Sequence, residues 1–257
     1  MPKPACLAIS ILLAMASAHA VAGNACIVRS GTQVMPLVEL YTSEGCSSCP
    51  PADRWLSASV RDDDANFLAF HVDYWDAIGW PDRFASPRFS RRQRMRVDAV
   101  GQRTVYTPQV MVGDEVQASW RSAGAWRKTL ARARRTATAA LTMRLVPNAS
   151  GWQATIGAAP LGAVPAGATL WVARYIDGQA SDVRAGENRG ATLHHDRVVR
   201  QLSGPWPLPL SGALSRQLEL PAESAPWGLT AFVQDARGDV LQSLNVQSLE
   251  CGDAGEP

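Results

Sequence analysis

The sequence predicts an open α/β domain over residues 34–140, followed by an antiparallel all-β, sandwich-like domain over residues 141–250. The first domain is predicted because short apolar runs rich in β-forming residues alternate with helix-like stretches. The second is predicted because the pattern changes after about residue 140. From there, short segments of alternating apolar and polar residues lie between Pro- and Gly-rich breaks, with no long helical period.

Within the α/β pattern, the apolar runs are short enough to be buried strands. Strands are expected over residues 34–41, 66–74, 104–112 and 116–120. Helices are expected over the stretches that follow Cys49, over residues 86–100, and after Ser122, which fits an N-cap. Strands that alternate with helices indicate a sheet with some parallel pairing.

The composition is that of a globular protein with a balanced charge. Of its 257 residues, 46% are apolar, and 25 basic against 23 acidic residues give a net charge of +2. A disordered or fibrous chain is excluded, and nothing suggests the basic face of a nucleic-acid-binding protein. No glycine-rich phosphate loop, Ser-His-Asp order or HExxH motif is present. We therefore expect no nucleic-acid partner and no cofactor.

The first twenty residues have the pattern of a secretory signal peptide. Lys3 supplies the positive charge, Leu7–Met15 the apolar run, and the small residues around His19 a cleavage site after Ala20. The apolar run is too short for a membrane-spanning helix, although an uncleaved anchor is the alternative. We expect a periplasmic or secreted mature chain without stable membrane insertion, in a compartment that permits disulfides.

Four cysteines remain after cleavage, and they allow three pairings. Cys46 and Cys49 have CxxC spacing, whereas Cys26 and Cys251 lie at the two ends of the mature chain. If Cys26 pairs with Cys251, the bond is a structural disulfide that closes a very long loop. Two free thiols are the alternative, which an oxidising compartment disfavours.

The CxxC spacing predicts redox chemistry. A thiolate attacks a disulfide, and a helix N-terminus stabilises a thiolate through its unpaired N–H groups and the helix dipole. Pro50 and Pro51 fit the first turn of a helix, which places Cys46 at or before its start. Cys46 is therefore the predicted nucleophile, and Cys49, one turn away, the resolving thiol.

Thr107-Pro108 interrupts a strand-like run. A proline there cannot donate to the sheet and marks an edge, a bulge or a cis bond. In a cis Thr-Pro, the preceding backbone is free to pair with an extended peptide, which would dock a substrate across Cys46. An edge-strand proline without an active role is the alternative.

A CxxC motif after the first buried strand, with Thr-Pro before a later strand, resembles the thioredoxin fold. More narrowly, the segments VELYTSEGCSSCPPAD, HVDYWDAIGWPDRFASPRFSRRQ and VYTPQVMV resemble the secreted thioredoxin-like family catalogued as domain-of-unknown-function family 1223. The resemblance covers roughly residues 34–250 and implies a thioredoxin-like first domain. It implies no activity, because the function of that family is unassigned.

The sequence departs from ordinary thioredoxins at two places, and it contains one acid that the resemblance makes a candidate. Ser47-Ser48 replaces the Gly-Pro dipeptide of ordinary thioredoxins, so the direction of redox chemistry is not predicted. Gly45 stands where thioredoxins have Trp. Thioredoxins carry a buried acid beneath the CxxC, and Glu39 is the candidate proton acceptor for Cys49. A solvated or salt-bridged strand residue is the alternative for Glu39.

Three other polar groups have a structural interpretation beside a functional one. We interpret His71 as a hydrogen-bonded core histidine, with Cu(I) ligation beside the two CxxC thiolates as the alternative. The arginine-rich run over residues 88–96 is interpreted as a solvated helix face, and otherwise as a surface for an acidic partner. His194-His195 is interpreted as an exposed pair.

These features predict an exported thiol-disulfide oxidoreductase in which Cys46 attacks, Cys49 resolves, and Thr107-Pro108 positions the substrate backbone. The substrate would be a protein or a small thiol or disulfide, regenerated by an unidentified redox partner. A non-catalytic periplasmic binding module with a structural CxxC disulfide is the first alternative. A Cu(I)-handling protein is the second, and no other metal is expected.

Overall fold

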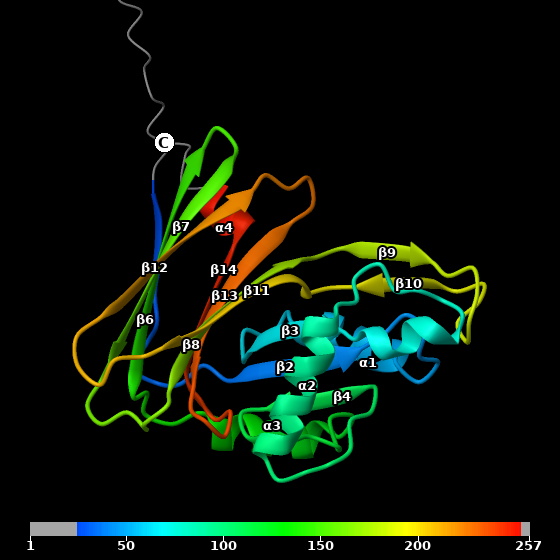
Figure 1. Cartoon of the computed structure of the whole chain (residues 1–257), viewed down its shortest axis with the longest axis horizontal. Helices are drawn as coiled ribbons and strands as arrows, with labels where there is room; N and C mark the ends of the chain where they lie inside the picture. The colour runs from blue at the N-terminus through cyan, green and yellow to red at the C-terminus, as the bar shows by residue number, and fades with distance from the viewer. Residues whose placement is uncertain (1–24, 253–257) are drawn as a thin grey trace, which may run out of the picture.

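The computed structural model describes residues 25–252. These residues form an eight-stranded mixed sheet, a four-stranded antiparallel sheet and a two-stranded hairpin (Figure 1). The helices are α1 (Pro50–Ser59), the 3-10 helix η1 (Asp73–Ile78), α2 (Pro87–Ala99), α3 (Ala123–Ala133) and α4 (Ser248–Gly252). Within the described residues, no helix is long and apolar enough to cross a membrane. The predicted signal peptide lies outside these residues.

The large sheet takes strands from both halves of the chain. Across the sheet they are β14 (Val240–Gln247), β13 (Trp227–Gln234), β8 (Thr169–Ile176), β11 (Val198–Pro207), β3 (Asn66–His71), β2 (Leu37–Thr42), β4 (Gln109–Val112) and β5 (Glu115–Val116). β2 pairs with β3 in parallel, and β11 joins β3 in parallel, with Val198 opposite Ala69. The predicted division near residue 140 therefore does not interrupt this sheet, and the two-domain organisation stays a prediction.

The second sheet supplies the antiparallel pairing that the alternating segments predict. Its order is β1 (Cys26–Arg29), β6 (Ala139–Asn148), β7 (Gly151–Pro160) and β12 (Leu214–Pro221). In β6, the alternate residues Leu141, Met143 and Leu145 are buried, and they share a core cluster with Val172 of β8 and Leu229 of β13. The two sheets are therefore held together by an apolar core, whose residues come largely from the second half of the chain.

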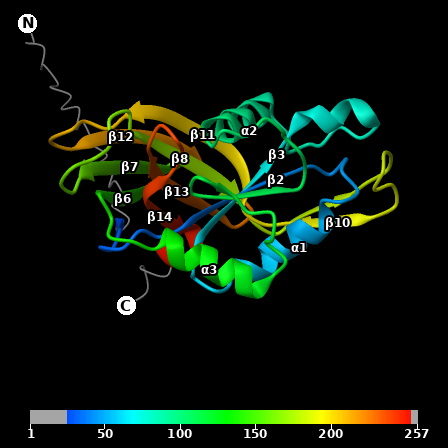
Figure 2. The ribbon, with the colours of Figure 1, turned by 90° about the horizontal axis from the view of Figure 1, so that it is seen from below.

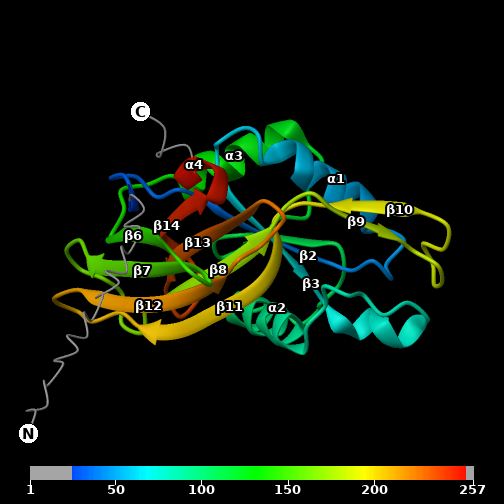
Figure 3. The ribbon, with the colours of Figure 1, turned by 90° about the horizontal axis from the view of Figure 1, so that it is seen from above.

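The helices cover both faces of the β2–β3 part of the large sheet (Figures 2 and 3). Because successive strand residues point to opposite faces, Val38 and Leu40 of β2 pack in the cluster that contains Leu56 of α1 and Leu130 of α3. Tyr41 and Phe70 pack on the other face, in the cluster that contains Phe89 of α2. The predicted strand–helix alternation is thus observed, as part of a mixed α/β structure that is mostly β.

Several boundaries differ from the prediction. The strand expected over residues 104–112 begins only at Gln109, directly after Pro108, which has no N–H to donate to the sheet. Of the strand expected over residues 116–120, only Val116 lies in a strand, at the end of β5. The sequence did not predict β1, because its residues are too few to show an alternating pattern. Ser122 does cap α3, since its side chain accepts a hydrogen bond from the N–H of Ala125.

The two ends of the described chain are joined by a disulfide between Cys26 of β1 and Cys251 of α4. The two cysteines are 225 positions apart in the sequence, and both are buried. This bond is the structural disulfide considered from the sequence, and two disulfides in one chain are typical of an oxidising, extracytoplasmic compartment.

We expect replacement of both cysteines, in Cys26→Ala/Cys251→Ala, to lower the free energy of unfolding by up to about 5 kcal/mol. The reason is that the cross-link restricts the unfolded chain over a very long loop. Urea denaturation followed by circular dichroism measures the change. Cys46→Ala/Cys49→Ala opens a far shorter loop, with a sequence separation of 3, and is the control. An equal loss in both variants would contradict the loop-entropy explanation.

Candidate functional site

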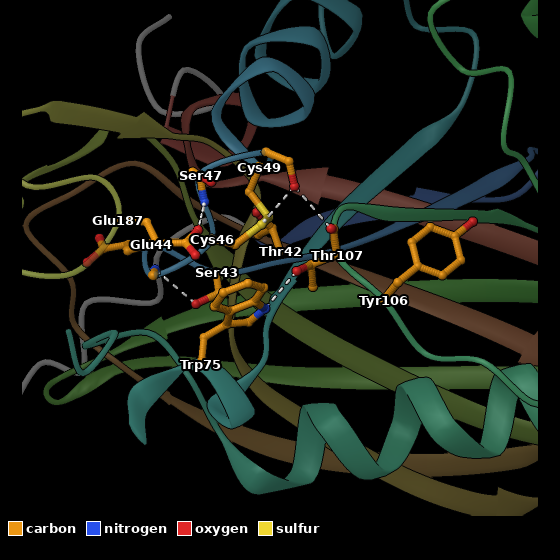
Figure 4. Close-up of a disulfide and its surroundings, with 12 residues drawn as sticks. Thr42, Ser43, Glu44, Cys46, Ser47, Cys49, Trp75, Tyr106, Thr107 and Glu187 are labelled. Carbon is orange, nitrogen blue, oxygen red and sulfur yellow. Dashed lines mark hydrogen bonds between the residues drawn. A yellow bond between two sulfur atoms is a disulfide. The ribbon is translucent and has the colours of Figure 1, made fainter. Parts of the chain in front are cut away.

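The CxxC motif lies where β2 passes into α1, and its cysteines form a disulfide (Figure 4). β2 ends at Thr42, and α1 begins at Pro50 with Cys49 as its N-cap residue. No side chain caps this helix end, and Pro50 and Pro51 occupy its first turn, where an N–H has no helical partner anyway. Cys46 therefore precedes the helix, as the two prolines predict.

Hydrogen bonds connect the motif to the cis Thr107–Pro108 bond. The Ser48 hydroxyl lies 3.3 Å from Cys46 Sγ and donates to the Thr107 carbonyl oxygen, also at 3.3 Å. The indole N–H of Trp75 donates to the Thr107 hydroxyl at 2.8 Å (Figure 4). Ser48 and Thr107 are 59 positions apart in the sequence. The structure thus brings the CxxC motif and Thr107-Pro108 together from distant parts of the first half.

The same packing accounts for Gly45, where thioredoxins carry Trp. A Cβ atom at this position would lie 3.1 Å from Cβ of Trp75, which is tighter than ordinary van der Waals contact. Trp75, in η1, therefore occupies the space next to the first cysteine that a side chain at position 45 would need.

A hairpin from the second half of the chain covers the CxxC loop. It consists of β9 (Gln179–Asp182) and β10 (Thr192–His195), and it runs beside α1 (Figures 1 and 3). In the connecting loop, Asn188 donates from its side-chain amide to the carbonyl oxygens of Glu44 and Cys46, at 2.8 and 2.9 Å. Glu187 accepts from the Ser47 N–H at 3.0 Å. Both cysteines of the motif are completely buried.

Behind the disulfide lies a buried cluster of ionisable side chains: Glu44, Asp53, His71, Asp82 and His195. His71 Nδ1 is 2.6 Å from Asp82 Oδ2, and the same Asp82 oxygen accepts from the Glu44 N–H. His195 Nε2 is 3.4 Å from Glu44 Oε1, and His195 Nδ1 is 3.9 Å from Asp53 Oδ2. The rings of His71 and His195 meet edge to face, with centroids 4.9 Å apart.

Burial and mutual charge set the protonation of this cluster. Burial opposes the charged form of His71, but the carboxylate of Asp82 outweighs it and raises the pKa of His71. Burial would likewise raise the pKa of Asp82, but His71 lowers it. Burial raises the pKa of Asp53 above its usual value, against the opposing effect of His195 and His71. Asp53 is therefore the carboxyl of this cluster whose pKa is raised, whereas the pKa values of Glu44 and Asp82 are lowered.

Glu39, the predicted proton acceptor, lies in a different environment. Its carboxylate is buried on β2 and makes salt bridges with Arg92 and Arg96 of α2, with N···O distances of 2.7 and 3.1 Å. It also accepts from the Tyr41 hydroxyl at 2.7 Å. Burial raises the pKa of Glu39, but the two guanidinium groups outweigh it and hold the pKa at about 2. This is the salt-bridged alternative left open by the sequence.

The arginine-rich run over residues 88–96 is only partly the solvated face that we expected. Arg92 and Arg96 are buried, because the helical period turns these two residues toward the sheet and Glu39. His194-His195 is likewise only half exposed, since alternation along β10 leaves His194 outside and buries His195.

His71 is the hydrogen-bonded core histidine that we expected, because its Nδ1 pairs with Asp82. The described residues contain no group of three or more His, Cys, Asp and Glu side chains arranged to hold a metal ion. The geometry therefore gives no support to His71 as a third ligand beside Cys46 and Cys49.

Sequence reasoning missed Glu44, Asp53, Asp82 and His195. For Asp53 a signal existed: it follows Cys49 by four positions, which places both residues on one face of the predicted helix. No comparable signal existed for His195 or Asp82, because only the fold brings them to the CxxC loop.

The family described as a protein of unknown function, DUF1223, matches residues 37–234. The chain belongs to this family. No curated protein matches. The crystal structure of protein AGR_C_4864 from Agrobacterium tumefaciens is similar, with 25% identity and a TM-score of 0.61 over 83% of this chain and 94% of that one. HBP35 of Porphyromonas gingivalis is similar in fold, with 14% identity and a TM-score of 0.59 over 84% of this chain and 76% of that one.

We expect Glu39→Gln to lower the free energy of unfolding by about 3–5 kcal/mol, because it leaves two buried guanidinium groups without a carboxylate. In the unmodified protein the folded-state pKa of about 2 lies below the unfolded value of 4.5. The contribution of Glu39 is therefore complete above pH 4.5 and is lost as the pH falls towards 2. Denaturant unfolding at several pH values measures the loss of stability and its dependence on pH. If the stability of Glu39→Gln falls with acid as steeply as that of the unmodified protein, the assignment is wrong.

We expect Asn188→Ala to speed the reduction of Cys46–Cys49 by a phosphine about 5- to 30-fold. The variant removes two hydrogen bonds of about 1 kcal/mol each that hold the covering loop on the CxxC loop. Time-resolved alkylation and mass spectrometry measure the rate. Arg189→Ala, at an exposed position of the same loop, is the control and should react like the unmodified protein. Equal rates in all three proteins would show that the loop does not limit access.

Proposed function

We propose that this chain is an exported thiol-disulfide oxidoreductase with a thioredoxin-like catalytic half. Its redox centre is the Cys46–Cys49 pair. The observation that carries the proposal is the position of this pair at a helix N-terminus, hydrogen-bonded through Ser48 to the cis Thr107–Pro108 segment. A helix N-terminus stabilises a thiolate, and the second cysteine lies within reach to resolve a mixed disulfide.

The arrangement of the first half supports the thioredoxin-like assignment. β2 and β3 run in parallel, β4 pairs antiparallel with β2, and helices cover both faces. Between β2 and α1 lies the CxxC, and the cis proline comes directly before β4. These are the relative positions that a nucleophilic cysteine and a substrate-docking backbone require.

In the reductive direction, the Cys46 thiolate attacks one sulfur of a substrate disulfide, and the other sulfur leaves as a thiolate. Cys49 then loses its proton and attacks Cys46 Sγ, which releases the second substrate thiolate and forms the Cys46–Cys49 disulfide. The two electrons gained by the substrate come from the two cysteines. A dithiol of unidentified origin restores the reduced pair, and the oxidative direction is the reverse.

The covering loop limits how a substrate reaches the disulfide. Because both sulfurs are buried, attack on a substrate requires the loop that carries Glu187 and Asn188 to move away from the CxxC loop. The three hydrogen bonds that hold it are few enough to break without unfolding the sheet. A protein disulfide or a small disulfide would then reach Cys46 beside Thr107.

The alternative function is a non-catalytic binding module in which Cys46–Cys49 is a permanent structural disulfide. The complete burial of both sulfurs favours this alternative, because structural disulfides resist reduction. The two functions differ in the reduction potential of the pair, so one measurement separates them.

We expect the reduction potential of Cys46–Cys49 to lie between about −120 and −270 mV, the range of working oxidoreductases. Equilibration in glutathione or thioredoxin-range dithiol buffers, followed by alkylation and mass spectrometry, gives the value. Cys46→Ser should abolish insulin reduction and scrambled-ribonuclease reactivation. The control is Cys26→Ser/Cys251→Ser, which removes the other disulfide and keeps the CxxC. A potential below about −300 mV would establish the structural alternative.

A further inference from the structure

A cavity of about 570 Å³ lies at the end of β2 and β3 opposite to the end that carries the CxxC motif. Its wall includes Met35, which precedes β2, Asn66 at the start of β3, and Asn245 of β14. The CxxC motif instead follows Thr42, the last residue of β2. A volume of this size is typical of sites that bind small molecules, and the proposed redox centre does not line it.

Arg197 places a buried positive charge in the wall of this cavity. Only 9% of its side chain is exposed. Its Nη1 donates to the Tyr175 hydroxyl, whereas no described residue accepts a hydrogen bond from its buried Nε. The carboxylate of Asp177 is 3.8 Å from Nε, beyond hydrogen-bond distance. Because a guanidinium carries five N–H donors, the described residues leave Arg197 with unused hydrogen-bonding capacity.

The backbone holds Arg197 in this position. Its φ of 57° is a left-handed conformation that residues other than glycine rarely adopt. Its N–H donates to Asp177 Oδ1 at 2.6 Å, and its carbonyl oxygen accepts from the Ala69 N–H at 2.8 Å. Such conformations persist only where surrounding contacts enforce them, and they cluster at functional sites. The fold therefore fixes the position from which the guanidinium reaches the cavity.

Asn245 supplies a second donor to the cavity. Its Oδ1 accepts from the hydroxyls of Tyr175 and Thr230, both at 2.9 Å. Two donors at Oδ1 fix the orientation of the amide, so Nδ2 points away from both hydroxyls. Within the described residues Nδ2 makes no hydrogen bond, and Asn245 lines the cavity. Tyr175 joins the two groups, because its hydroxyl accepts from Arg197 and donates to Asn245.

The rest of the wall is partly apolar and partly acidic. The apolar side chains in it include Met35, Val60, Phe67 and Leu244. Two carboxylates, Asp63 and Glu250, also line the cavity, but both residues are exposed. Water and salt screen exposed charges far more than buried ones. Arg197 is therefore the charge that acts most strongly on a bound ligand.

We propose that this cavity binds a small organic carboxylate with an apolar body. The carboxylate accepts from the Arg197 guanidinium and from Asn245 Nδ2, and the apolar body packs against the apolar part of the wall. A carboxylate suits the guanidinium because its two oxygens match the spacing of two N–H donors. This binding site is separate from the proposed redox function and does not depend on it.

Isothermal titration calorimetry of the protein with both disulfides intact tests the proposal with three probes. Phenylacetate carries both features, phenylacetamide has the same shape without the charge, and acetate has the charge without the ring. We expect phenylacetate to bind with a Kd of about 1 mM or tighter, and each of the other two probes at least about tenfold more weakly. Affinity for phenylacetate no greater than for either other probe, or no binding of phenylacetate, would overturn the proposal.

Two variants test where the probe binds. Asn245→Asp keeps an acceptor for Tyr175 and Thr230 and replaces the Nδ2 donor with a negatively charged oxygen. Arg197→Gln removes the positive charge. We expect either variant to weaken phenylacetate binding about 10- to 100-fold, because both lose charge-assisted hydrogen bonds. Arg144→Gln, at an exposed position of β6 outside the cavity, is the matched control and should bind like the unmodified protein. Equal affinities in all four proteins would contradict the assignment.

A measurement on the unmodified protein keeps the test valid if Arg197→Gln does not fold. Phenylacetate should shift the side-chain NH₂ resonances of Asn245 and the Nε–H resonance of Arg197 in ¹⁵N correlation spectra. The NH₂ resonances of Asn188, whose amide donates to Glu44 and Cys46 at the other end of the strands, should stay in place. Shifts at Asn188 without shifts at Asn245 and Arg197 would place the ligand elsewhere and overturn the proposal.

Failure of this inference differs from failure of the proposed function. If phenylacetate binds in the cavity and the reduction potential of Cys46–Cys49 lies below about −300 mV, the carboxylate site stands and the oxidoreductase is wrong. If the potential lies in the working range and phenylacetate does not bind, the oxidoreductase stands and the carboxylate site is wrong.

Discussion

The buried carboxylate of Glu39 is the interaction on which the rest of the structure depends. A charge in the protein interior is tolerable only with a paired counter-charge and hydrogen bonds. Glu39 of β2 meets both requirements through Arg92 and Arg96 of α2, and Arg92 also donates to Gln234 of β13. The ion pair thereby connects three elements: β2, the helix α2 that covers it, and β13 from the second half of the chain.

Strands from both halves of the chain lie in one sheet. β11 adds to β3 in parallel at the edge where the first half would otherwise end, so the large sheet is continuous. The β9–β10 hairpin precedes β11 and is therefore held beside α1, where Asn188 and His195 reach the CxxC loop and the acids behind it. The second half of the chain completes the site around the cysteines, because it supplies both Asn188 and His195.

The Cys46–Cys49 disulfide lies between a covering loop and a buried ionisable cluster. Coverage by Glu187 and Asn188 protects Cys46–Cys49 from solvent thiols. In the buried cluster, His195 lies between two acids, 3.4 Å from Glu44 and 3.9 Å from Asp53. Under the proposed function, a partner has to displace the covering loop before it reaches Cys46.

The sequence by itself determined the local features: the helix start at Pro50, the break in the strand at Pro108, the capping by Ser122 and the alternation in β6. Each depends on residues within a few positions of one another. Only the tertiary structure decided that Glu39 faces Arg92 and that His195 joins Asp53 beside the CxxC loop. The physical reason is that the pairing of a buried charge is settled by packing between segments far apart in the chain, which no local pattern records.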